Sequence, residues 1–543
     1  MTLQTIETSP IAGQKPGTSG LRKKTRVFMQ AGYLENFVQS VFDAIGGAKG
    51  KVFVVGGDGR YYNKQAIQII LKMAAANGAD KVIVGQNGIL STPAVSHLIR
   101  LNQTNGGLIL SASHNPGGID EDFGVKFNGD NGGPATEKVG EAIYHNTSII
   151  NRYLTVKEDD VDLGQIGEQR VADMVVEIVD PVADYLALMK KLFDFDCIRG
   201  LFASGFSLRF DAMHAVTGPY ATAILEGELG AAPGSVINGQ PLEDFGGGHP
   251  DPNPVWARPL VDLMMSDSAP DFGAASDGDG DRNMIVGKGI YVTPSDSLAV
   301  LTANADLVPA YQAGLAGVAR SMPTSAACDR VAEKLGFESY ETPTGWKFFG
   351  NLLDAGKVTL CGEESAGTGS SHVREKDGLW AVLLWLNILG ERKQSVVQIL
   401  QQHWREFGRN YYSRHDYEAV PVEAANQLMD GVISRFSQLP SEKFASLVVS
   451  EADEFSYHDP VDGSISSNQG IRIHFEGGGR AVLRLSGTGT EGATVRLYME
   501  QYVAPEDLAG ISTADALDSV RTATLELAQF EKFLGRTQPD VIS

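Results

Sequence analysis

The feature of this chain that most constrains its fold is a repeated order of short apolar runs, glycine- or aspartate-rich loops and amphipathic stretches. The apolar run at residues 51–58 leads to an amphipathic stretch at 63–75, and the run at 81–85 leads to another at 92–101. Strand-like runs that alternate with helix-like stretches are typical of α/β layers. We therefore expect an α/β fold.

The same order continues along the chain and indicates several domains. A chain of 543 residues fits three or four domains at roughly 150 residues each. A second α/β pattern runs from about residue 182 to 294 and a third from there to about 408, whereas strand-like runs with flanking helices dominate the last quarter. We expect three α/β domains and a C-terminal α+β domain, at residues 1–183, 184–295, 296–408 and 409–543.

Charge, cysteines and the N-terminal segment narrow the classes of partner. The formal net charge of −22 repels phosphate backbones and anionic lipids, so we expect no nucleic-acid partner and no membrane partner. The three cysteines form no CxxC pair, which indicates free thiols in a reducing compartment. Residues 1–20 are polar, and no apolar run reaches the roughly 18 residues of a membrane span. We expect a cytoplasmic protein.

An acidic loop with regularly spaced glycines is the most informative segment. Asp277, Asp279 and Asp281 lie two residues apart between two strand-like runs. In an extended turn this spacing can direct three carboxylates to one point, a site that Mg²⁺ accepts when a phosphate oxygen completes its shell. An EF-hand is excluded, because Arg282 and Lys288 occupy positions that need glycine and glutamate. A solvated acidic turn is the alternative, but three crowded carboxylates without a cation are electrostatically costly.

A second loop, residues 111–118 (SASHNPGG), contains a candidate nucleophile. It follows the apolar run 107–110 and so lies at a strand end, where α/β folds place active sites. Ser113 lacks the flanking glycines of a G-x-S-x-G elbow, so a hydrolase triad is not indicated. His114 is its neighbour in sequence, which alone does not make it a base. An ordinary turn is the alternative for this segment.

A third loop, residues 484–492 (RLSGTGTEG), contains a G-x-G-x-x-G pattern. The residues that follow, 493–498, have the pattern of a strand and not of the helix that a dinucleotide site requires. Glycines and hydroxyl side chains between Arg484 and Arg496 instead suit a phosphate cradle. An ordinary hairpin is the alternative.

A fourth loop, residues 362–378, is polar and charged and precedes the apolar run 378–389, which predicts a buried helix. Its carboxylates and hydroxyls can bind sugar hydroxyls, while His372, Arg374 and Lys376 can bind an anion. A solvated loop is the alternative for any single member. Together, however, the four loops offer a cation site, a nucleophile, a phosphate cradle and groups that bind sugar hydroxyls, and each meets a different need of one reaction.

These motifs resemble those of the α-D-phosphohexomutase superfamily and, within it, of the glucose-specific phosphoglucomutases. The resemblance extends nearly from end to end of the chain. The matching segments are residues 15–22 (KPGTSGLR), 112–118 (ASHNPGG), 277–282 (DGDGDR), 341–347 (ETPTGWK), 362–365 (GEES) and 484–488 (RLSGT). The resemblance implies three similar α/β domains with mixed sheets and a smaller C-terminal α+β domain around a central cleft.

The resemblance also implies roles for particular residues, with Ser113 as the phosphoryl carrier and Lys376 as a further acid/base candidate. The implied metal set is Ser113, Asp277, Asp279 and Asp281. The implied catalytic set is Ser113, Lys126, His114, Arg22, Lys376 and Arg282. The implied substrate contacts are Thr18, Ser19, Thr344, Gly345, Trp346, Lys347, Glu363, Ser365, His372, Arg374, Lys376, Arg484, Ser486, Gly487, Thr488 and Arg496.

The activity implied is the interconversion of α-D-glucose 1-phosphate and glucose 6-phosphate through a phosphoserine, with Mg²⁺ as cofactor and glucose 1,6-bisphosphate as intermediate and activator. The partners expected are hexose phosphates, bound by a monomer or dimer. Two other hypotheses remain: a mutase for mannose or aminosugar phosphates, and a catalytically silent mutase-like scaffold. Two departures from the family pattern, Ala366 and Ser371, weaken the sugar-loop assignment more than the serine and metal assignments.

Overall fold

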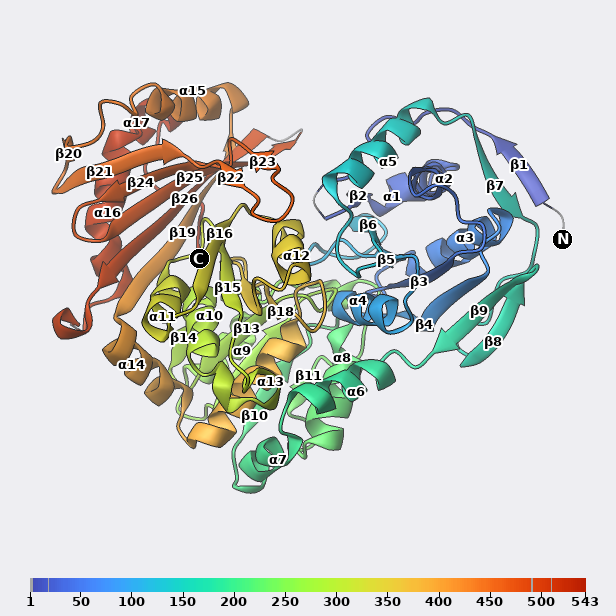
Figure 1. The fold of residues 1–543 in the computed structure, drawn as a ribbon, viewed down its shortest axis with the longest axis horizontal. Coiled ribbons are helices and arrows are strands. Elements are labelled where there is room, and N and C mark those ends of the chain that lie inside the picture. Colours follow the sequence, from blue (N-terminus) through green and yellow to red (C-terminus); the bar gives the residue numbers. More distant parts are fainter. Residues whose placement is uncertain (1–2, 18, 490–491, 509) are drawn as a thin grey trace.

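The structure, a computed structural model, describes residues 3–17, 19–489, 492–508 and 510–543. These residues form three α/β units followed by a C-terminal α+β unit (Figure 1). In this view the first unit lies on the right, the C-terminal unit at the upper left, and the segments between them below. The expected fold class is confirmed, while the domain boundaries at residues 183, 295 and 408 stay predictions.

The first unit is built on a seven-stranded mixed sheet. Its central strand β3 is parallel to β4 and β5 and is buried along almost its whole length, as expected for a strand with both faces covered. The strand order is β2 (Leu21–Lys24), β6 (Asp122–Asn128), β5 (Gly107–Leu110), β3 (Val52–Gly57), β4 (Lys81–Ile89), β9 (Met174–Val179) and β8 (Gly167–Val171). The other elements are α1 (Thr25–Phe28), α2 (Tyr33–Ala44), α3 (Asn63–Ala76), α4 (Thr92–Leu101), α5 (Glu137–Ile149) and the paired strands β1 (Leu3–Glu7) and β7 (Arg152–Val156).

The second unit has a five-stranded mixed sheet, in which β12 is parallel to β10 and antiparallel to β13. The loop between β12 and β13 is the acidic loop. The strand order is β11 (Val236–Ile237), β10 (Leu208–Asp211), β12 (Phe272–Ser276), β13 (Asn283–Gly287) and β14 (Ile290–Val292). The α-helices of this unit are α6 (Ala183–Leu192), α7 (Phe195–Ala203), α8 (Thr217–Ala221) and α9 (Arg258–Met264).

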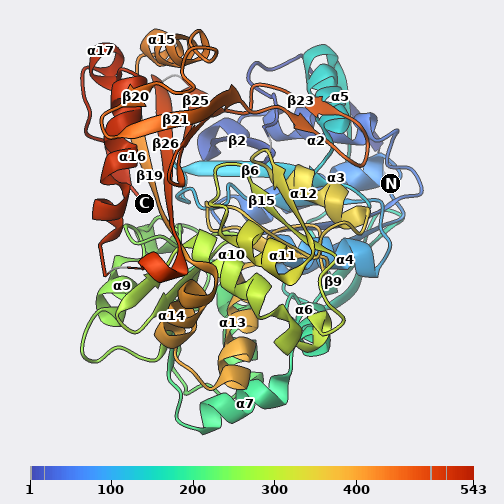
Figure 2. The ribbon, with the colours of Figure 1, turned by 60° about the vertical axis from the view of Figure 1, so that its left-hand side comes forward.

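The third unit has a four-stranded mixed sheet, in which β15 is parallel to its two neighbours. The strand order is β16 (Glu338–Thr342), β15 (Gly317–Ser321), β17 (Leu360–Gly362) and β18 (Thr368–Ser370). The helices are α10 (Pro294–Ala303), α11 (Ala327–Leu335), α12 (Trp346–Asp354), α13 (Gly378–Arg392) and α14 (Val396–Phe407). In the turned view of Figure 2, α11 and α12 lie in front of the first unit.

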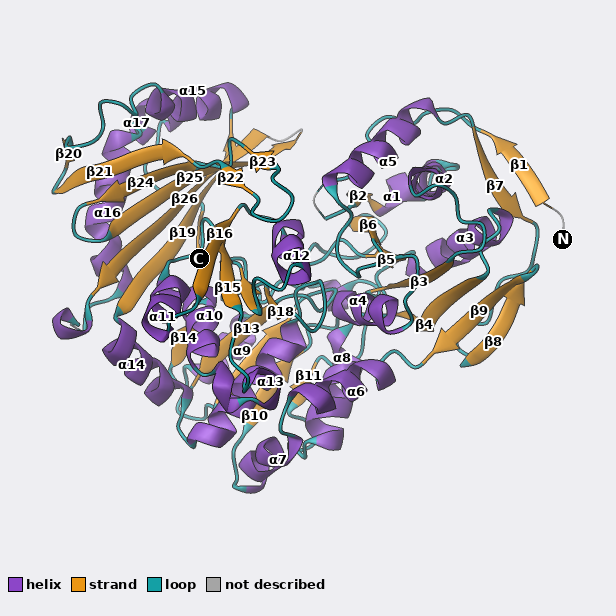
Figure 3. Cartoon of the chain, in the orientation of Figure 1, coloured by secondary structure: helices purple, strands orange, loops and turns teal. Residues whose placement is uncertain are grey.

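The C-terminal unit has an antiparallel sheet with helices packed against one face (Figure 3). The apolar face of the sheet packs on the helices. This leaves the opposite, more polar face, which also carries the smaller cluster of Tyr412, Val482 and Tyr498, for the rest of the protein. The strand order is β20 (Lys443–Phe444), β21 (Leu447–Glu454), β24 (Ile471–Phe475), β25 (Gly479–Gly489), β26 (Gly492–Val503), β19 (Arg409–Val420) and β27 (Val541–Ile542). The helices are α15 (Val422–Ile433), α16 (Thr513–Leu527) and α17 (Phe530–Leu534).

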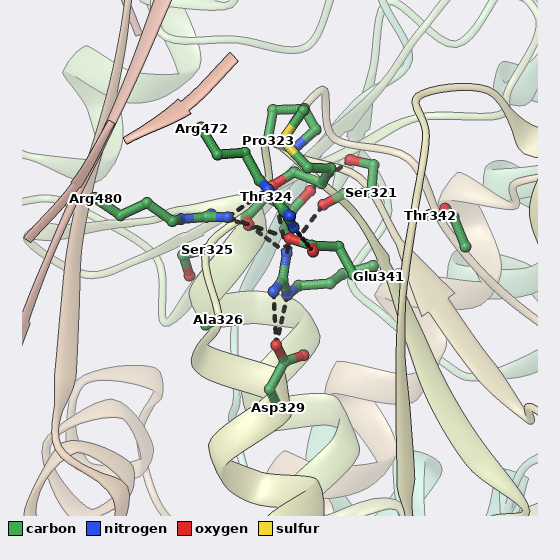
Figure 4. Close-up of polar contacts among 12 residues, drawn as sticks. Ser321, Pro323, Thr324, Ser325, Ala326, Asp329, Glu341, Thr342, Arg472 and Arg480 are labelled. Atoms are coloured by element: carbon green, nitrogen blue, oxygen red, sulfur yellow. Dashed lines mark hydrogen bonds and ion pairs between the residues drawn. The ribbon is translucent and has the colours of Figure 1, made fainter. Parts of the chain in front are cut away.

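Ion pairs dock the polar face of the C-terminal sheet on the third unit (Figure 4). Arg472 of β24 and Arg480 of β25 both reach Glu341 of β16, at 2.6 and 3.4 Å. Arg320 of β15 pairs with the same carboxylate at 3.0 Å and with Asp329 at 2.7 Å. Because largely buried charges are costly unless paired, this network restricts how the two units can lie against each other.

Helix α13 lies in a core to which all three α/β units contribute. Its residues from Gly378 to Gly390 are buried, as predicted from the apolar run. The indole nitrogen of Trp385 donates to Ser297 and that of Trp380 donates to Tyr311, both at 2.9 Å. No helix among the described residues is long and apolar enough to cross a membrane.

We expect Leu384→Ala in α13 to lower the thermal unfolding midpoint, because Leu384 is fully buried in this core. Truncation of a buried leucine costs about 2–5 kcal/mol. The matched control is Leu101→Ala at the end of α4, whose side chain is 50% exposed. Scanning calorimetry of both variants checks this, and equal midpoints would contradict the assignment of α13 to the core.

Candidate active site

Ser113 lies in the loop that follows β5, in a backbone conformation that non-glycine residues seldom adopt, with φ of 53°. Two contacts hold its backbone there. The Ser113 N–H donates to Ser111 Oγ (2.7 Å), and the Ser113 carbonyl accepts from Arg60 Nη2 (2.8 Å). Arg60 and Ser111 are in turn joined by the buried carboxylate of Asp58. This buried hydrogen-bond network fixes the backbone of Ser113, and so fixes the place from which its hydroxyl projects.

The acidic loop meets this serine directly. Ser113 Oγ donates to Asp277 Oδ2 at 3.0 Å. The close approach requires glycine at position 278, because a Cβ there would lie 2.3 Å from the Ser113 carbonyl oxygen. The chain thus brings together a hydroxyl of the first unit and a carboxylate of the second.

The three aspartates converge as the spacing predicts. Asp277, Asp279 and Asp281 are buried, and one ligand atom from each lies within 4.8 Å of the others. Thr92 donates to Asp279 Oδ2 at 2.6 Å. The Oδ1 atoms of Asp279 and Asp281, however, have no hydrogen-bond partner among the described residues. A buried set of carboxylate oxygens with unused lone pairs fits a hard divalent cation.

Burial and mutual repulsion change the pKa values of these carboxylates. Burial raises the pKa of Asp277 well above its ordinary value, and the charges of Asp281 and Asp279 raise it further. Burial acts in the same direction on Asp279, but Lys126, the hydrogen bond from Thr92, and the charges of Lys376 and Arg22 together outweigh it and lower its pKa to about 2. Negative charge at this loop is therefore stabilised only where cations from other segments reach it.

Those cations come from all three α/β units. Lys376 pairs with Asp281 at 3.1 Å, and Lys126 pairs with Glu375 at 3.1 Å. Burial disfavours both ammonium groups, but Glu375 acting on Lys126, and Asp281 acting on Lys376, raise the pKa of each. Both lysines are therefore cationic. Arg282, next to the acidic loop, completes the set.

His114 lies beside the serine, with Nδ1 3.3 Å from Ser113 Oγ. Burial lowers the pKa of His114 well below its ordinary value, and the charges of Arg282, Arg22 and Lys376 lower it further. The imidazole is therefore neutral. A neutral ring nitrogen at this distance can exchange a hydrogen bond with the serine hydroxyl or with a group bound to it.

A cleft of about 270 Å³ opens above these groups. All three α/β units and the C-terminal unit contribute to its walls, as expected for a central cleft. The predicted residues that line it are Ser19, Arg22, Ser113, Lys126, Asp281, Arg282, Thr344, Gly345, Trp346, Glu363, Ser365, Lys376, Arg484 and Arg496. Two of the loops are joined directly, because the Gly345 N–H donates to Glu363 Oε1 at 3.1 Å.

Two residues predicted to contact substrate have other partners in this structure. His372 stacks on Trp380, and its Nε2 lies 3.0 Å from Asp377 Oδ2. Arg374 pairs with Asp354 and donates to backbone carbonyls of its own loop. Neither is among the described residues that line the cleft. Both residues order the polar loop in this structure, and their contacts with substrate stay predictions.

The other predicted contacts fall outside the cleft or outside the described part of the chain. Lys347 pairs with Glu137 at 3.1 Å and lines a neighbouring pocket. Ser486 lies on β25 but is not one of the described residues that line the cleft. Thr18 is not one of the described residues. The structure does not describe the side chain of Thr488 or the burial of Gly487 either. Their roles stay predictions.

The structure adds residues that the sequence analysis missed. Glu375 accepts a hydrogen bond from Lys126. Glu364, in the same polar loop, lines the cleft and pairs with Arg414. Both glutamates lie in the polar loop, beside predicted residues, so their position was a usable signal. Arg414 and Arg60 lie in segments without a recognisable motif, and their role depends on three-dimensional contacts alone.

Comparison with known families covers almost the whole chain. Residues 13–153, 183–289 and 294–407 match the phosphoglucomutase/phosphomannomutase α/β/α domains I, II and III, and residues 409–540 match the phosphoglucomutase-1 C-terminal domain. The chain belongs to the phosphoglucomutase/phosphomannomutase family. The phosphohexomutase resemblance of the motifs is thereby confirmed.

Named relatives of this phosphoglucomutase/phosphomannomutase family member match it end to end. A phosphoglucomutase of Rhizobium radiobacter is 60% identical over 541 residues, which is 100% of both chains. A cytoplasmic phosphoglucomutase of Pisum sativum is 52% identical over 100% of this chain and 99% of its own, whereas an Arabidopsis thaliana relative of 51% identity is named chloroplastic. The open form of pp63/parafusin, a phosphoglucomutase from Paramecium, has a TM-score of 0.94 at 49% identity, covering 100% of this chain and 99% of its own.

We expect Asp279→Asn to weaken binding of Mg²⁺ to the purified protein, because it removes one of three converging charges. Loss of even an outer-shell partner costs about 10- to 100-fold in metal affinity, so at least about tenfold is expected here. Isothermal calorimetry with Mg²⁺, and electron paramagnetic resonance with Mn²⁺, measure this without activity. The control is Asp267→Asn, an exposed aspartate of the same unit. Unchanged affinity in Asp279→Asn would exclude this loop as the metal site.

Proposed function

We propose that this protein is a phosphoglucomutase that interconverts α-D-glucose 1-phosphate and glucose 6-phosphate through phosphoserine 113 and glucose 1,6-bisphosphate. The observation that carries the proposal is the contact of Ser113 Oγ with Asp277 at 3.0 Å, in a cleft that also contains Arg484 and Arg496 of a separate unit. One cleft thus offers a phosphoryl carrier and a second anion site. The full-length relatives named phosphoglucomutase support the choice of glucose.

The first transfer breaks the bond between Ser113 Oγ and phosphorus and forms a bond from phosphorus to O6 of glucose 1-phosphate. The hydroxyl proton of O6 leaves, and Ser113 Oγ gains a proton as its bond to phosphorus breaks. The neutral His114, 3.3 Å from Ser113 Oγ, is the candidate base, and the cationic Lys376 is the candidate acid. Arg22, Lys126 and Arg282 neutralise the phosphoryl oxygens, which is the main demand of this transition state. Mg²⁺ held by the three aspartates and a phosphoserine oxygen would add further charge stabilisation.

The second transfer needs the same groups in reverse. Glucose 1,6-bisphosphate turns end for end, and Ser113 Oγ bonds to the phosphorus of the 1-phosphate as the bond from that phosphorus to O1 breaks. The proton of the Ser113 hydroxyl leaves, O1 takes up a proton, and glucose 6-phosphate departs. In both halves of the cycle one phosphate does not react and must be held elsewhere. Arg484 and Arg496 are the proposed site for that phosphate, with Ser486, Gly487 and Thr488 as its predicted backbone and hydroxyl donors.

The sugar itself would be held between two loops. Glu363 and Ser365 present a carboxylate and a hydroxyl, while Thr344, Gly345 and Trp346 line the facing wall. The wider assignments are part of the same proposal: hexose phosphates as partners, a monomer or dimer, and a cytoplasmic location. A silent scaffold is not favoured, because the serine and the acidic loop are intact. A mannose-specific mutase is not favoured, because the full-length relatives are named phosphoglucomutase.

We expect Ser113→Ala to abolish turnover of glucose 1-phosphate, even with added glucose 1,6-bisphosphate, because no other atom at this place can carry the phosphoryl group. Intact-mass measurement should show a phosphoryl adduct on the wild type, mapped to the peptide of Ser113, and none on the variant. The control is Ser434→Ala, an exposed serine of the C-terminal unit. Wild-type activity in Ser113→Ala would overturn the assignment.

We expect a bisphosphorylated sugar to draw the C-terminal unit toward the first unit, because Arg484 and Arg496 belong to a different unit from Ser113. Closure would also concentrate the cleft cations and exclude water from the phosphoserine. Small-angle scattering of Ser113→Ala with glucose 1,6-bisphosphate should show a smaller radius of gyration, whereas glucose should leave it unchanged. An unchanged radius at saturating bisphosphate would mean that the cradle is preformed.

A further inference from the structure

A chain of alternating charges connects the sugar loop of the third unit to the phosphate cradle of the C-terminal unit. Arg414 of β19 pairs through Nη1 with Glu364 Oε2 at 3.3 Å and through Nε with Asp416 Oδ1 at 3.0 Å. Asp416 Oδ2 lies 3.6 Å from Nε of Arg496, which lines the cleft. Glu364, Arg414, Asp416 and Arg496 therefore alternate in sign between the two sites.

The strand register fixes this order. β19 and β26 are antiparallel, with Asp416 opposite Arg496. Arg414 is two residues from Asp416 and so lies on the same face of the sheet. On the other side of Arg496, Arg484 of β25 is its direct cross-strand neighbour. Like charges directly opposite each other destabilise a sheet, and the carboxylate of Asp416 offsets that repulsion when no phosphate is bound.

Burial makes Arg414 necessary to both carboxylates. The side chains of Glu364 and Asp416 are only 5% and 6% exposed, and a buried carboxylate is costly without a paired cation. Burial raises the pKa of Asp416, while Arg414 and then Arg496 lower it. Without Arg414, the charge of Asp416 would be neutralised by Arg496 alone. Asp416 would then bind the Arg496 guanidinium more tightly, and Arg496 would bind the phosphate more weakly.

We propose that Arg414 is a positioning residue for both ends of the substrate, orienting Arg496 through Asp416 and fixing the sugar loop through Glu364. The inference rests on the proposed function, because it concerns a phosphorylated sugar in the same cleft. Arg414 is not among the described residues that line the cleft, so it acts through its neighbours. The loop of Glu364 also carries the proposed sugar ligands Glu363 and Ser365, so contacts with the sugar and with the distal phosphate become coupled.

The test compares Arg414→Gln with wild type in initial-rate assays at saturating glucose 1,6-bisphosphate. We expect the KM for glucose 1-phosphate to rise roughly tenfold, the size of a typical coupling between contacting residues, with a much smaller change in kcat. Arg414→Lys should give an intermediate KM, because a single ammonium cannot span two carboxylates as a guanidinium fork does. This milder variant also keeps the test decisive if Arg414→Gln fails to fold.

A double-mutant cycle separates positioning from stability. Because part of the effect of Arg414 passes through Arg496, the double variant Arg414→Gln/Arg496→Ala should lose less kcat/KM than the two single losses combined. The matched control is Arg472→Gln, which removes another arginine between the same two units, 2.6 Å from Glu341 and away from the cleft. Its unfolding midpoint should fall while its KM stays at the wild-type value.

The outcomes distinguish this inference from the function on which it rests. Active wild type with an unchanged KM in Arg414→Gln, losses that simply add in the double variant, or an equal rise of KM in Arg472→Gln would each overturn the positioning role alone. A wild type with neither phosphoserine nor turnover would overturn the proposed function, and the positioning role with it.

Discussion

The structure depends on the burial of three carboxylates beside one serine hydroxyl. Asp277, Asp279 and Asp281 cannot remain charged in a low-dielectric site unless positive charge surrounds them. No single unit supplies enough of it: Lys126 comes from the first unit and Lys376 from the third. Neutralisation of the acidic loop therefore requires the α/β units to pack around it, and the cleft lies where they meet.

The same requirement explains how an acidic protein can bind a doubly charged sugar phosphate. A net charge of −22 repels such a ligand at long range. The cleft, however, collects Arg22, Lys126, Arg282, Arg484 and Arg496 in a small, partly buried volume, where local Coulomb interactions outweigh the screened field of the distant surface. Three of these cations, Arg22, Lys126 and Arg282, also act on the acidic loop, so a phosphate would meet cations that already balance its carboxylates.

Sequence reasoning predicted the fold class, the convergence of the aspartates and the place of Ser113, because each depends on local spacing or on strand ends. It also predicted a strand at residues 493–498 in place of the helix of a dinucleotide turn, and these residues lie in β26. It did not foresee that His372 stacks on Trp380 of α13 or that Arg374 pairs with Asp354 of α12, since these contacts join segments that are separate in sequence. Arg414 was missed for the same reason: the role of a lone arginine in a strand depends on its contact with Glu364 and on the strand register, and neither can be read from its local sequence.

The two ends of the cleft differ in construction in a way that matches the two duties of a mutase. The reacting end is rigid, because Ser113 is fixed by a buried network beneath it and abuts Gly278 without space for a side chain. The distal end is a hairpin on a separate unit, with Arg496 supported by a chain of ion pairs rather than by close packing. Phosphoryl transfer demands in-line geometry at the serine, whereas an intermediate that must turn end for end requires a second site that can release and recapture a phosphate. A fixed carrier facing an electrostatically held cradle meets both demands within one cleft.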